Sequence, residues 1–101
     1  MLIKIFVRTF PSTEDCELFE SILETRWPNL LQIVKGVRFR AMKNPQTPNV
    51  NVVLWEFPDN DSIKKIEKLI EENISKYVKT LVPKTVHFVG AVTQDFGETS
   101  F

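Results

Sequence analysis

The feature that most constrains the fold is a short run in the middle of the chain, VNVVLWEF, at positions 50–57. Successive side chains of a β-strand point to opposite faces of the sheet, so a strand with one wet face alternates apolar and polar residues. In this run both faces carry apolar residues: Val53, Trp55 and Phe57 on one face, and Val50, Val52 and Leu54 on the other. Each face therefore needs a layer that covers it.

The segments around this strand predict the remaining elements. Alternating residues predict strands over residues 2–10, 37–43, 50–57 and 84–96. Apolar residues at helical spacing predict helices over residues 12–35 and 62–81. Pro28 disfavours the helical conformation at Trp27, so we expect the first helix to split there into two pieces. The last five residues, 97–101, are expected to form a tail.

The predicted order of elements is β-α-β-β-α-β. This order is typical of the α+β class with the ferredoxin-like arrangement, a four-stranded antiparallel sheet with two helices on one face. The chain has 101 residues, and we expect residues 1–101 to form a single domain of this kind.

The two helices cover only one face of such a sheet. We expect that helix face to hold Ile3, Ile5 and Val7 of the first strand and Val86, Phe88 and Val92 of the last. The open face would then carry Lys4, Phe6, Arg8, Arg38, Arg40, Met42, Val50, Val52, Leu54, Glu56, His87, Val89, Ala91 and Thr93. Such a face is too apolar for bulk water and too charged for a sealed core, so it predicts a surface that a partner or a ligand covers.

Short motifs between positions 36 and 92 suggest a relationship. They are a glycine before the second strand, Pro-Asn before the Val/Leu-rich strand, an acidic and aromatic end to that strand, and Pro-Lys-Thr-Val at the start of the last strand. In these motifs and in its layout the chain resembles the dimeric α+β barrel superfamily, in particular the small antibiotic-biosynthesis-monooxygenase-like proteins. The resemblance implies a homodimer in which two sheets pack open face to open face around a pocket.

The same resemblance implies a function. The superfamily includes oxygenases, cyclases, haem-degrading enzymes and proteins with no known activity. It implies a small-molecule-binding protein, with a cofactor-free monooxygenase acting on an aromatic or hydrophobic substrate as one form and a non-catalytic binding or structural protein as the alternative. Haem-degrading members use an asparagine on the first strand and a histidine on the second helix, and this chain has neither. We therefore expect no haem and no other cofactor.

Candidate site residues come from the predicted open face. His87 is the only side chain with an ordinary pKa near neutrality, which makes it the candidate catalytic acid or base. Arginine side chains on the same face suit a carboxylate or a phenolate above an apolar floor. The candidate ligand contacts are Phe6, Arg8, Arg40, Leu54 and Glu56. The alternatives are a hydrogen-bonded structural histidine and arginines that pair with Glu56 or across the dimer.

Several classes of site are excluded by residue type. One cysteine, Cys16, and one histidine cannot form a zinc site of thiolate and imidazole ligands. No apolar run approaches the roughly 20 residues of a membrane span. A single cysteine is typical of a reducing compartment. We expect no metal site, no membrane contact and a cytoplasmic location.

One further fold shares this order of elements. Residues 5–23 resemble the opening of an RNA-recognition motif, with Phe6 as its stacking ring. The aromatic positions of that motif's third strand are Val52 and Leu54 here, and each lost stacking ring forfeits about 1–3 kcal/mol per base. The 13 basic residues are balanced by 13 acidic ones, whereas nucleic-acid binders carry a basic excess. Single-stranded RNA binding is therefore the less favoured alternative.

Overall fold

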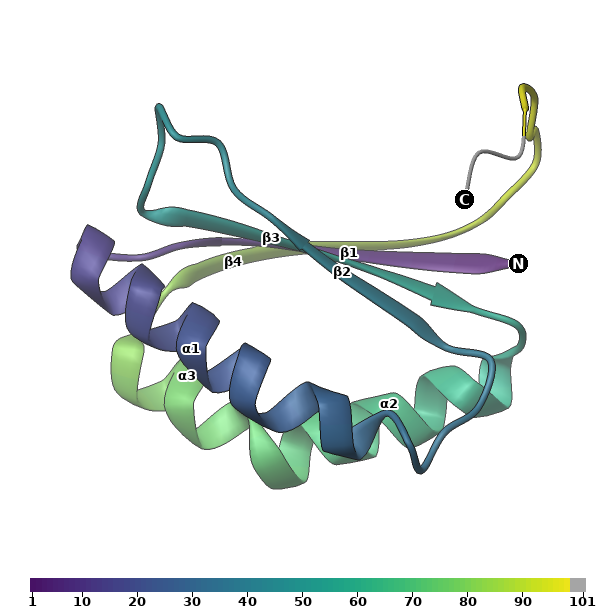
Figure 1. Ribbon diagram of the computed structural model, residues 1–101, viewed down its shortest axis with the longest axis horizontal. Coiled ribbons are helices and arrows are strands. Elements are labelled where there is room, and N and C mark those ends of the chain that lie inside the picture. The colour runs from purple at the N-terminus through teal and green to yellow at the C-terminus, as the bar shows by residue number, and fades with distance from the viewer. Residues whose placement is uncertain (99–101) are drawn as a thin grey trace.

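The computed structural model describes residues 1–98 of the chain. Its strands are β1 (Leu2–Thr9), β2 (Arg38–Met42), β3 (Val50–Phe57) and β4 (Lys84–Ala91), and its helices are α1 (Thr13–Leu30), α2 (Asn60–Asn73) and α3 (Ser75–Leu81). The strands form one antiparallel sheet in the order β2-β3-β1-β4. All three helices lie on the same side of this sheet (Figure 1). The predicted ferredoxin-like α+β fold is confirmed.

Both longer helices begin at a capping side chain. Ser12 Oγ accepts a hydrogen bond from the Asp15 backbone N–H at 3.1 Å and starts α1. Asp59 Oδ1 accepts one from the Ser62 backbone N–H at 2.8 Å and starts α2, and this bond lowers the pKa of Asp59. Such caps satisfy backbone donors that have no partner within the helix.

The predicted split of the first helix at Trp27 is wrong. Helix α1 continues through Pro28 to Leu30, and the Leu31 N–H donates to the Trp27 carbonyl at 2.9 Å. Pro28 is an exposed residue in the last turn of α1, so the hydrogen bond that it cannot donate is lost near the end of the helix and not in its middle. The second helical piece is absent from residues 31–36, which form turns.

The second predicted helix is instead interrupted. Helices α2 and α3 are separated at Ile74, whose φ of −117° departs from helical geometry. The Ser75 hydroxyl donates to the Ile70 carbonyl at 3.3 Å beside this break, and Ile74 is buried in the core. Strand β4 is also shorter than predicted, since it ends at Ala91. The predicted tail, residues 97–101, lies partly outside the described residues.

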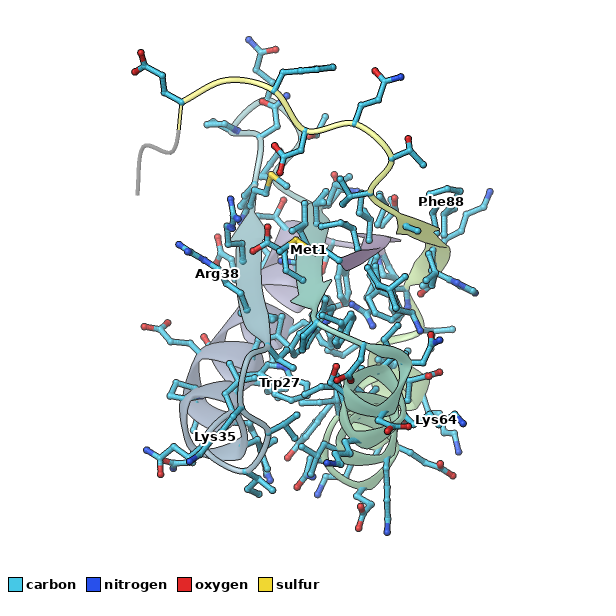
Figure 2. The ribbon with its side chains drawn as sticks, turned by 90° about the vertical axis from the view of Figure 1, so that its right-hand side faces the viewer. Met1, Trp27, Lys35, Arg38, Lys64 and Phe88 are labelled. Carbon is cyan, nitrogen blue, oxygen red and sulfur yellow. The ribbon has the colours of Figure 1, made fainter. Side chains whose placement is uncertain are left out.

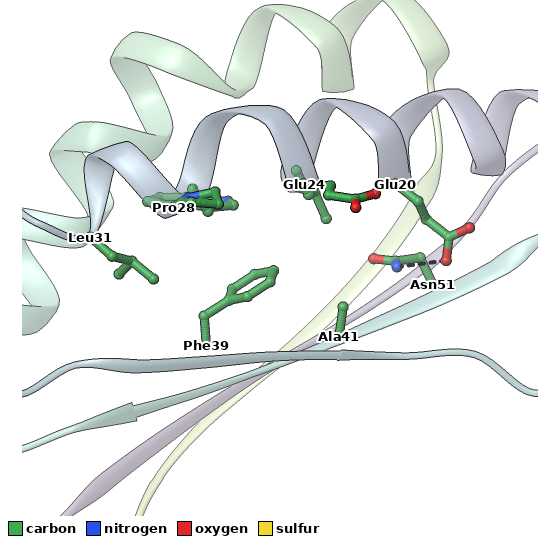
Figure 3. A pocket seen from close by; sticks show the side chains of 9 residues that line it. Glu20, Glu24, Pro28, Leu31, Phe39, Ala41 and Asn51 are labelled. Carbon is green, nitrogen blue, oxygen red and sulfur yellow. Dashed lines mark hydrogen bonds between the residues drawn. The ribbon is translucent and has the colours of Figure 1, made fainter.

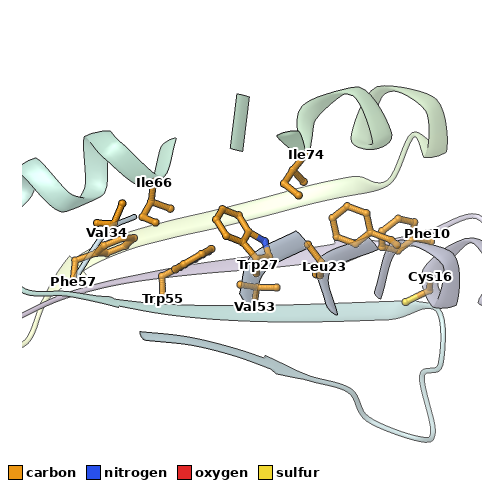
Figure 4. Close-up of a cluster of buried hydrophobic side chains, with 11 residues drawn as sticks. Phe10, Cys16, Leu23, Trp27, Val34, Val53, Trp55, Phe57, Ile66 and Ile74 are labelled. Atoms are coloured by element: carbon orange, nitrogen blue, oxygen red, sulfur yellow. The ribbon is translucent and has the colours of Figure 1, made fainter. Parts of the chain in front are cut away.

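The core between helices and sheet is built around Trp55 of β3 (Figure 4). Its ring meets Trp27 of α1 edge-on, with 4.7 Å between ring centroids, and meets Phe39 of β2 edge-on at 4.9 Å. It also stacks with Phe57 at 5.9 Å. Edge-to-face aromatic pairs add about 0.5–1.5 kcal/mol beyond their buried area. The helix face predicted for β3 is confirmed, because Val53, Trp55 and Phe57 are all buried there.

The register shows that the two faces of β1 were assigned the wrong way round. Residues directly opposite one another on neighbouring antiparallel strands share a face. Phe6 is opposite Val53 and Arg8 is opposite Asn51, so both lie on the helix face. Ile3, Ile5 and Val7 therefore lie on the open face. The prediction placed the more apolar set of β1 side chains on the helix face. Long cationic side chains can lie along an apolar surface, so the face that carries them can still pack against the helices.

Strand β4 carries the same error. His87 is opposite Phe6, and Val89 is opposite Lys4, so both lie on the helix side of the sheet. Val86 and Phe88 lie on the open face, where they are 63% and 68% exposed. Figure 2 shows Phe88 pointing away from the helices.

The corrected open face is more apolar than predicted. It carries nine apolar side chains in the strand register, with a polar group at the β2 edge: Ile3, Ile5, Val7, Met42, Val50, Val52, Leu54, Val86 and Phe88, then Arg38, Arg40 and Glu56. None of the helices covers this face (Figure 1). An uncovered apolar surface of this kind marks an interaction site.

A test of the backbone concerns Val82, which joins α3 to β4. It adopts φ 50° and ψ 50°, the left-handed region, and its side chain is exposed. A left-handed conformation costs an L-residue about 1–2 kcal/mol. Substitution by glycine removes this strain, but the greater entropy of the unfolded chain offsets part of the gain in stability. We expect Val82→Gly to stabilise the protein by about 0.5–1 kcal/mol in thermal unfolding. Val82→Ala keeps the strain and is the control; a glycine variant that melts below the alanine variant would contradict this.

Candidate functional site

The structure divides the predicted site residues between the two faces of the sheet. Three lie on the open face as predicted and three on the helix face: Arg40, Leu54 and Glu56 on the former, and Phe6, Arg8 and His87 on the latter. The two groups point in opposite directions from the sheet, so they cannot line one pocket within a protomer.

The open-face group forms a cross-strand ion pair. Arg40 Nη2 lies 3.0 Å from Glu56 Oε1, and the carboxylate accepts a hydrogen bond from the guanidinium. Leu54 lies directly opposite Arg40 in the register and is half-buried. The alternative in which an arginine pairs with Glu56 is thus what the structure shows.

His87 lies at the sheet edge formed by β4. Its side chain is exposed, and its ring centroid is 6.1 Å from that of Phe6. It lines neither of the two cavities described below. A role in proton transfer therefore gains no support from the geometry.

A cavity of about 420 Å³, which we call the main cavity because of its apolar walls, lies between α1 and the β2 side of the sheet (Figure 3). Its walls are mostly apolar and are Leu23, Trp27, Pro28, Leu31, Phe39 and Ala41, with Glu20, Glu24 and Asn51 as polar members. The α1 residues recur at three- and four-residue steps, which places them on one helix face, and the β2 residues are two apart, which places them on one strand face. A volume of roughly 300–1,000 Å³ with few polar groups is typical of small-molecule sites.

The polar end of this cavity is held by a chain of hydrogen bonds. Lys43 Nζ donates to Glu20 Oε1 at 3.0 Å, which raises the pKa of Lys43, and Asn51 Nδ2 donates to Glu20 Oε2 at 3.3 Å. A carboxylate has no proton to donate, so the amide nitrogen of Asn51 must face Glu20. Figure 3 shows the amide oxygen pointing away from Glu20. Asn51 is fully buried, and its Oδ1 accepts no hydrogen bond from the described residues.

Arg8 is the neighbour of Asn51 across the strands β1 and β3. It is only 5% exposed, and its guanidinium carbon lies 4.4 Å from the ring centroid of Phe6 and 5.1 Å from that of Phe19. Its Nε–H has no acceptor among the described residues, and no described carboxylate forms an ion pair with it. Burial lowers the pKa of Arg8 to about 10, so the group is still a cation at neutral pH.

A second, much smaller cavity of about 10 Å³ borders Arg8. It shares three wall residues with the main cavity, namely Leu23, Trp27 and Phe39. The two spaces are thus neighbours in the layer between helices and sheet.

None of the residues that line the main cavity was predicted from the sequence as a site residue. Trp27, Glu20 and Asn51 were not among the candidates, because the search was restricted to the open face. One signal was available: Asn51 is the only polar residue on the strand face that it shares with Val53, Trp55 and Phe57. Burying an asparagine on such a face costs folding free energy unless its amide forms hydrogen bonds, so a buried asparagine there points to a polar partner.

Two further findings bear on the site. Residues 1–98 contain no group of three histidine, cysteine or acidic side chains placed to hold a metal ion. Cys16 is fully buried, and its pKa is raised by burial and by the nearby Glu20, which is typical of an unreactive thiol.

Within the described residues, every helix is too short or too polar to cross a membrane.

Comparison with known proteins places the fold among a group of solved structures. A dimeric ferredoxin-like protein from an uncultured marine organism is 23% identical, with 96% of this chain and 98% of that chain covered and a TM-score of 0.74. SnoaB, a cofactor-independent oxygenase from Streptomyces nogalater, is 16% identical over 96% of this chain and 97% of its own, with a TM-score of 0.69. A protein from Deinococcus radiodurans, provisionally assigned as an antibiotic biosynthesis monooxygenase, is 10% identical over 99% of this chain and all of that chain, with a TM-score of 0.81.

Comparison of the sequence alone found no relative. No protein-family model matches this sequence, and no curated protein matches it. The resemblance drawn from the sequence motifs is confirmed by these structures at the level of the fold. The chain has the ferredoxin-like fold that dimeric ferredoxin-like proteins and antibiotic-biosynthesis-monooxygenase-like proteins share.

Proposed function

We propose that this protein is a homodimer in which each protomer binds an aromatic small molecule in the cavity between α1 and β2. The observation that carries this proposal is the cavity itself, about 420 Å³ with mostly apolar walls and one buried, oriented amide at its polar end. Apolar walls favour an apolar ligand body, and the few polar groups fix its orientation.

The walls favour an aromatic ligand. Trp27 and Phe39 both line the cavity, with ring centroids 6.1 Å apart and ring planes inclined by 30°. Aromatic rings attract one another in offset and tilted arrangements, so a flat ligand between α1 and β2 gains contacts that an aliphatic one does not.

The proposed activity is cofactor-independent oxygenation, in line with the similarity to SnoaB. Without a metal or a flavin, the substrate itself must supply electrons to dioxygen, and an ionised hydroxyaromatic is electron-rich enough to do so. Glu24 lines the cavity and has no ion pair among the described residues, so it is our candidate general base for that ionisation. A non-catalytic binding protein is the alternative.

The proposed dimer forms through the open face of the sheet. A second copy would cover the nine apolar side chains that no helix covers, and similar solved structures are described as dimeric. This would also supply the second covering layer that β3 requires. Stable interfaces bury about 800 Å² per partner, and homodimer interfaces are the more apolar ones.

The register also bears on RNA binding. Phe6, the ring expected to stack on a base, lies on the helix face beside Val53 and His87. On the exposed face β1 and β3 present aliphatic side chains instead. Stacking platforms need aromatic rings on the open sheet, so this arrangement favours a protein partner over single-stranded RNA.

Filling the cavity should abolish ligand binding. Ala41→Phe places a ring in the cavity, whereas Ala91→Phe makes the same change on β4, outside it. We expect 2-naphthol at 100 times its dissociation constant to stabilise the parent and the Ala91 variant by about 2.7 kcal/mol in a thermal-shift assay. The Ala41 variant should show almost no shift. Equal shifts in both variants would place the ligand elsewhere.

Oxygen uptake separates the enzyme from the binding protein. We expect the parent to consume dissolved oxygen with 2-naphthol, measured at an oxygen electrode. Glu24→Gln should lower the rate about 100-fold or more, the usual contribution of a general base, while leaving binding within a few fold. Binding without oxygen uptake in the parent would favour the non-catalytic alternative.

A charge on the open face should prevent dimer formation. Leu54→Arg would bury an unpaired cation in each half of the interface, at a cost of about 3 kcal/mol or more. Sedimentation velocity should show a dimer for the parent and a monomer or aggregates for this variant. Leu18→Arg, at an exposed position of α1, should stay dimeric. A Leu54 variant that sediments and melts like the parent would rule out this interface.

A further inference from the structure

Arg8 is a buried cation with no anionic partner among residues 1–98. Its side chain lies among Phe6, Phe19 and Asn51, and none of these carries a negative charge. The two aromatic faces attract the guanidinium, by about 0.5–2 kcal/mol in each well-placed case. Removing a cation from water costs several kcal/mol, and an aromatic face accepts only a weak hydrogen bond from Nε–H. The side chain is therefore set up for a further partner.

The position of Arg8 directs that partner to the cavity described above. The small cavity beside Arg8 has room for about one water-sized group, since such a group needs roughly 10–15 Å³. Leu23, Trp27 and Phe39 separate it from the main cavity. Phe39 is half-buried on the edge strand β2. For one end of a ligand in the main cavity to reach Arg8, the Phe39 ring must move aside.

The charge of Arg8 determines which chemical group at that end of the ligand would bind it. The group is a cation at neutral pH, and its partner should be an anion at the same pH. Carboxylic acids ionise near pH 4, whereas phenols ionise near pH 10. An arginine–carboxylate hydrogen bond is charge-assisted and short, and a single carboxylate oxygen fits the small cavity.

We propose that Arg8 is the anion-binding residue of this cavity and that its ligand is an aromatic carboxylate. The proposal rests on the function proposed above and names the chemical class of its ligand. The ring lies between α1 and β2, and one carboxylate oxygen accepts the Arg8 Nε–H. Asn51 Oδ1, at the position opposite Arg8 in the strand register, accepts a hydrogen bond from a hydroxyl or amino group on the same ligand.

The test compares 2-naphthoate with 2-naphthamide, which has nearly the same shape and no charge. We expect the parent to bind 2-naphthoate more tightly, as measured by calorimetric titration at pH 7. Arg8→Met should weaken 2-naphthoate about 10- to 100-fold, the loss of one charge-assisted hydrogen bond, with little effect on 2-naphthamide. Arg26→Met makes the same change at a guanidinium that donates to the Tyr77 hydroxyl at 2.7 Å, and it should leave both affinities unchanged.

The outcomes distinguish this inference from the proposed function. If 2-naphthamide binds as tightly as 2-naphthoate, or if Arg8→Met weakens both equally, the cavity binds aromatic molecules and the role of Arg8 is overturned. If neither compound binds the parent, the proposed function is overturned as well.

Two further measurements do not depend on those affinities. The Arg8 Nε–H signal in a proton–nitrogen NMR spectrum, assigned by its contacts to the Phe6 and Phe19 rings, should shift with 2-naphthoate and not with 2-naphthamide. Without ligand, Arg8→Met should melt above the parent, because an unpaired charge leaves the interior. An unmoved signal, or a variant that melts well below the parent, would overturn the proposal.

Discussion

The structure depends on one strand that is apolar on both faces. On its helix face, Trp55 contacts Trp27 of α1, Phe39 of β2 and Phe57 of its own strand, and this aromatic cluster holds helix and sheet together. On its other face, Val52 and Leu54 have no helix above them. The first face fixes the internal fold, and the second requires a layer from outside the protomer. A second copy of the chain satisfies that requirement with the same residues on both sides.

The ligand cavity is a consequence of how α1 packs. Helix α1 is anchored on the sheet by its buried face, Cys16, Phe19, Leu23 and Trp27. Beyond that face, towards β2, the sheet offers the small side chain of Ala41, and the space between them stays open. The polar residues at this end of the cavity are connected to one another. Glu20 orients the Asn51 amide, and Arg8 lies directly across the strands from Asn51. A donor and an acceptor with no partner among residues 1–98 thus come from facing positions on β1 and β3, an arrangement that a ligand with complementary groups would complete.

Much of the fold could be predicted from the sequence because its patterns are strong. Strand β3 was predicted with the observed bounds, and the order of strands and helices followed from alternation and helical spacing. The faces of β1 could not be predicted by counting apolar residues. Lys4 reaches Glu67 of α2 at 3.7 Å and Arg8 packs on two rings, so the face with the charges is the covered one. The predicted ends of the helices were wrong for local reasons. Pro28 falls in the last turn of α1, and Ile74 leaves helical geometry where it enters the core. The site was missed because it is lined largely by α1, whereas the candidates were sought on the sheet.

The central claim is that the ligand lies between helix and sheet inside each protomer, and not between the two sheets of a dimer. The most direct test is an NMR measurement of close contacts between the ring protons of bound 2-naphthoate and the methyl groups of the protein. We expect contacts to the Ala41 methyl and to the Leu23 methyls, which line the cavity. Contacts to the methyls of Leu54 and Ile5, on the open face, would contradict it.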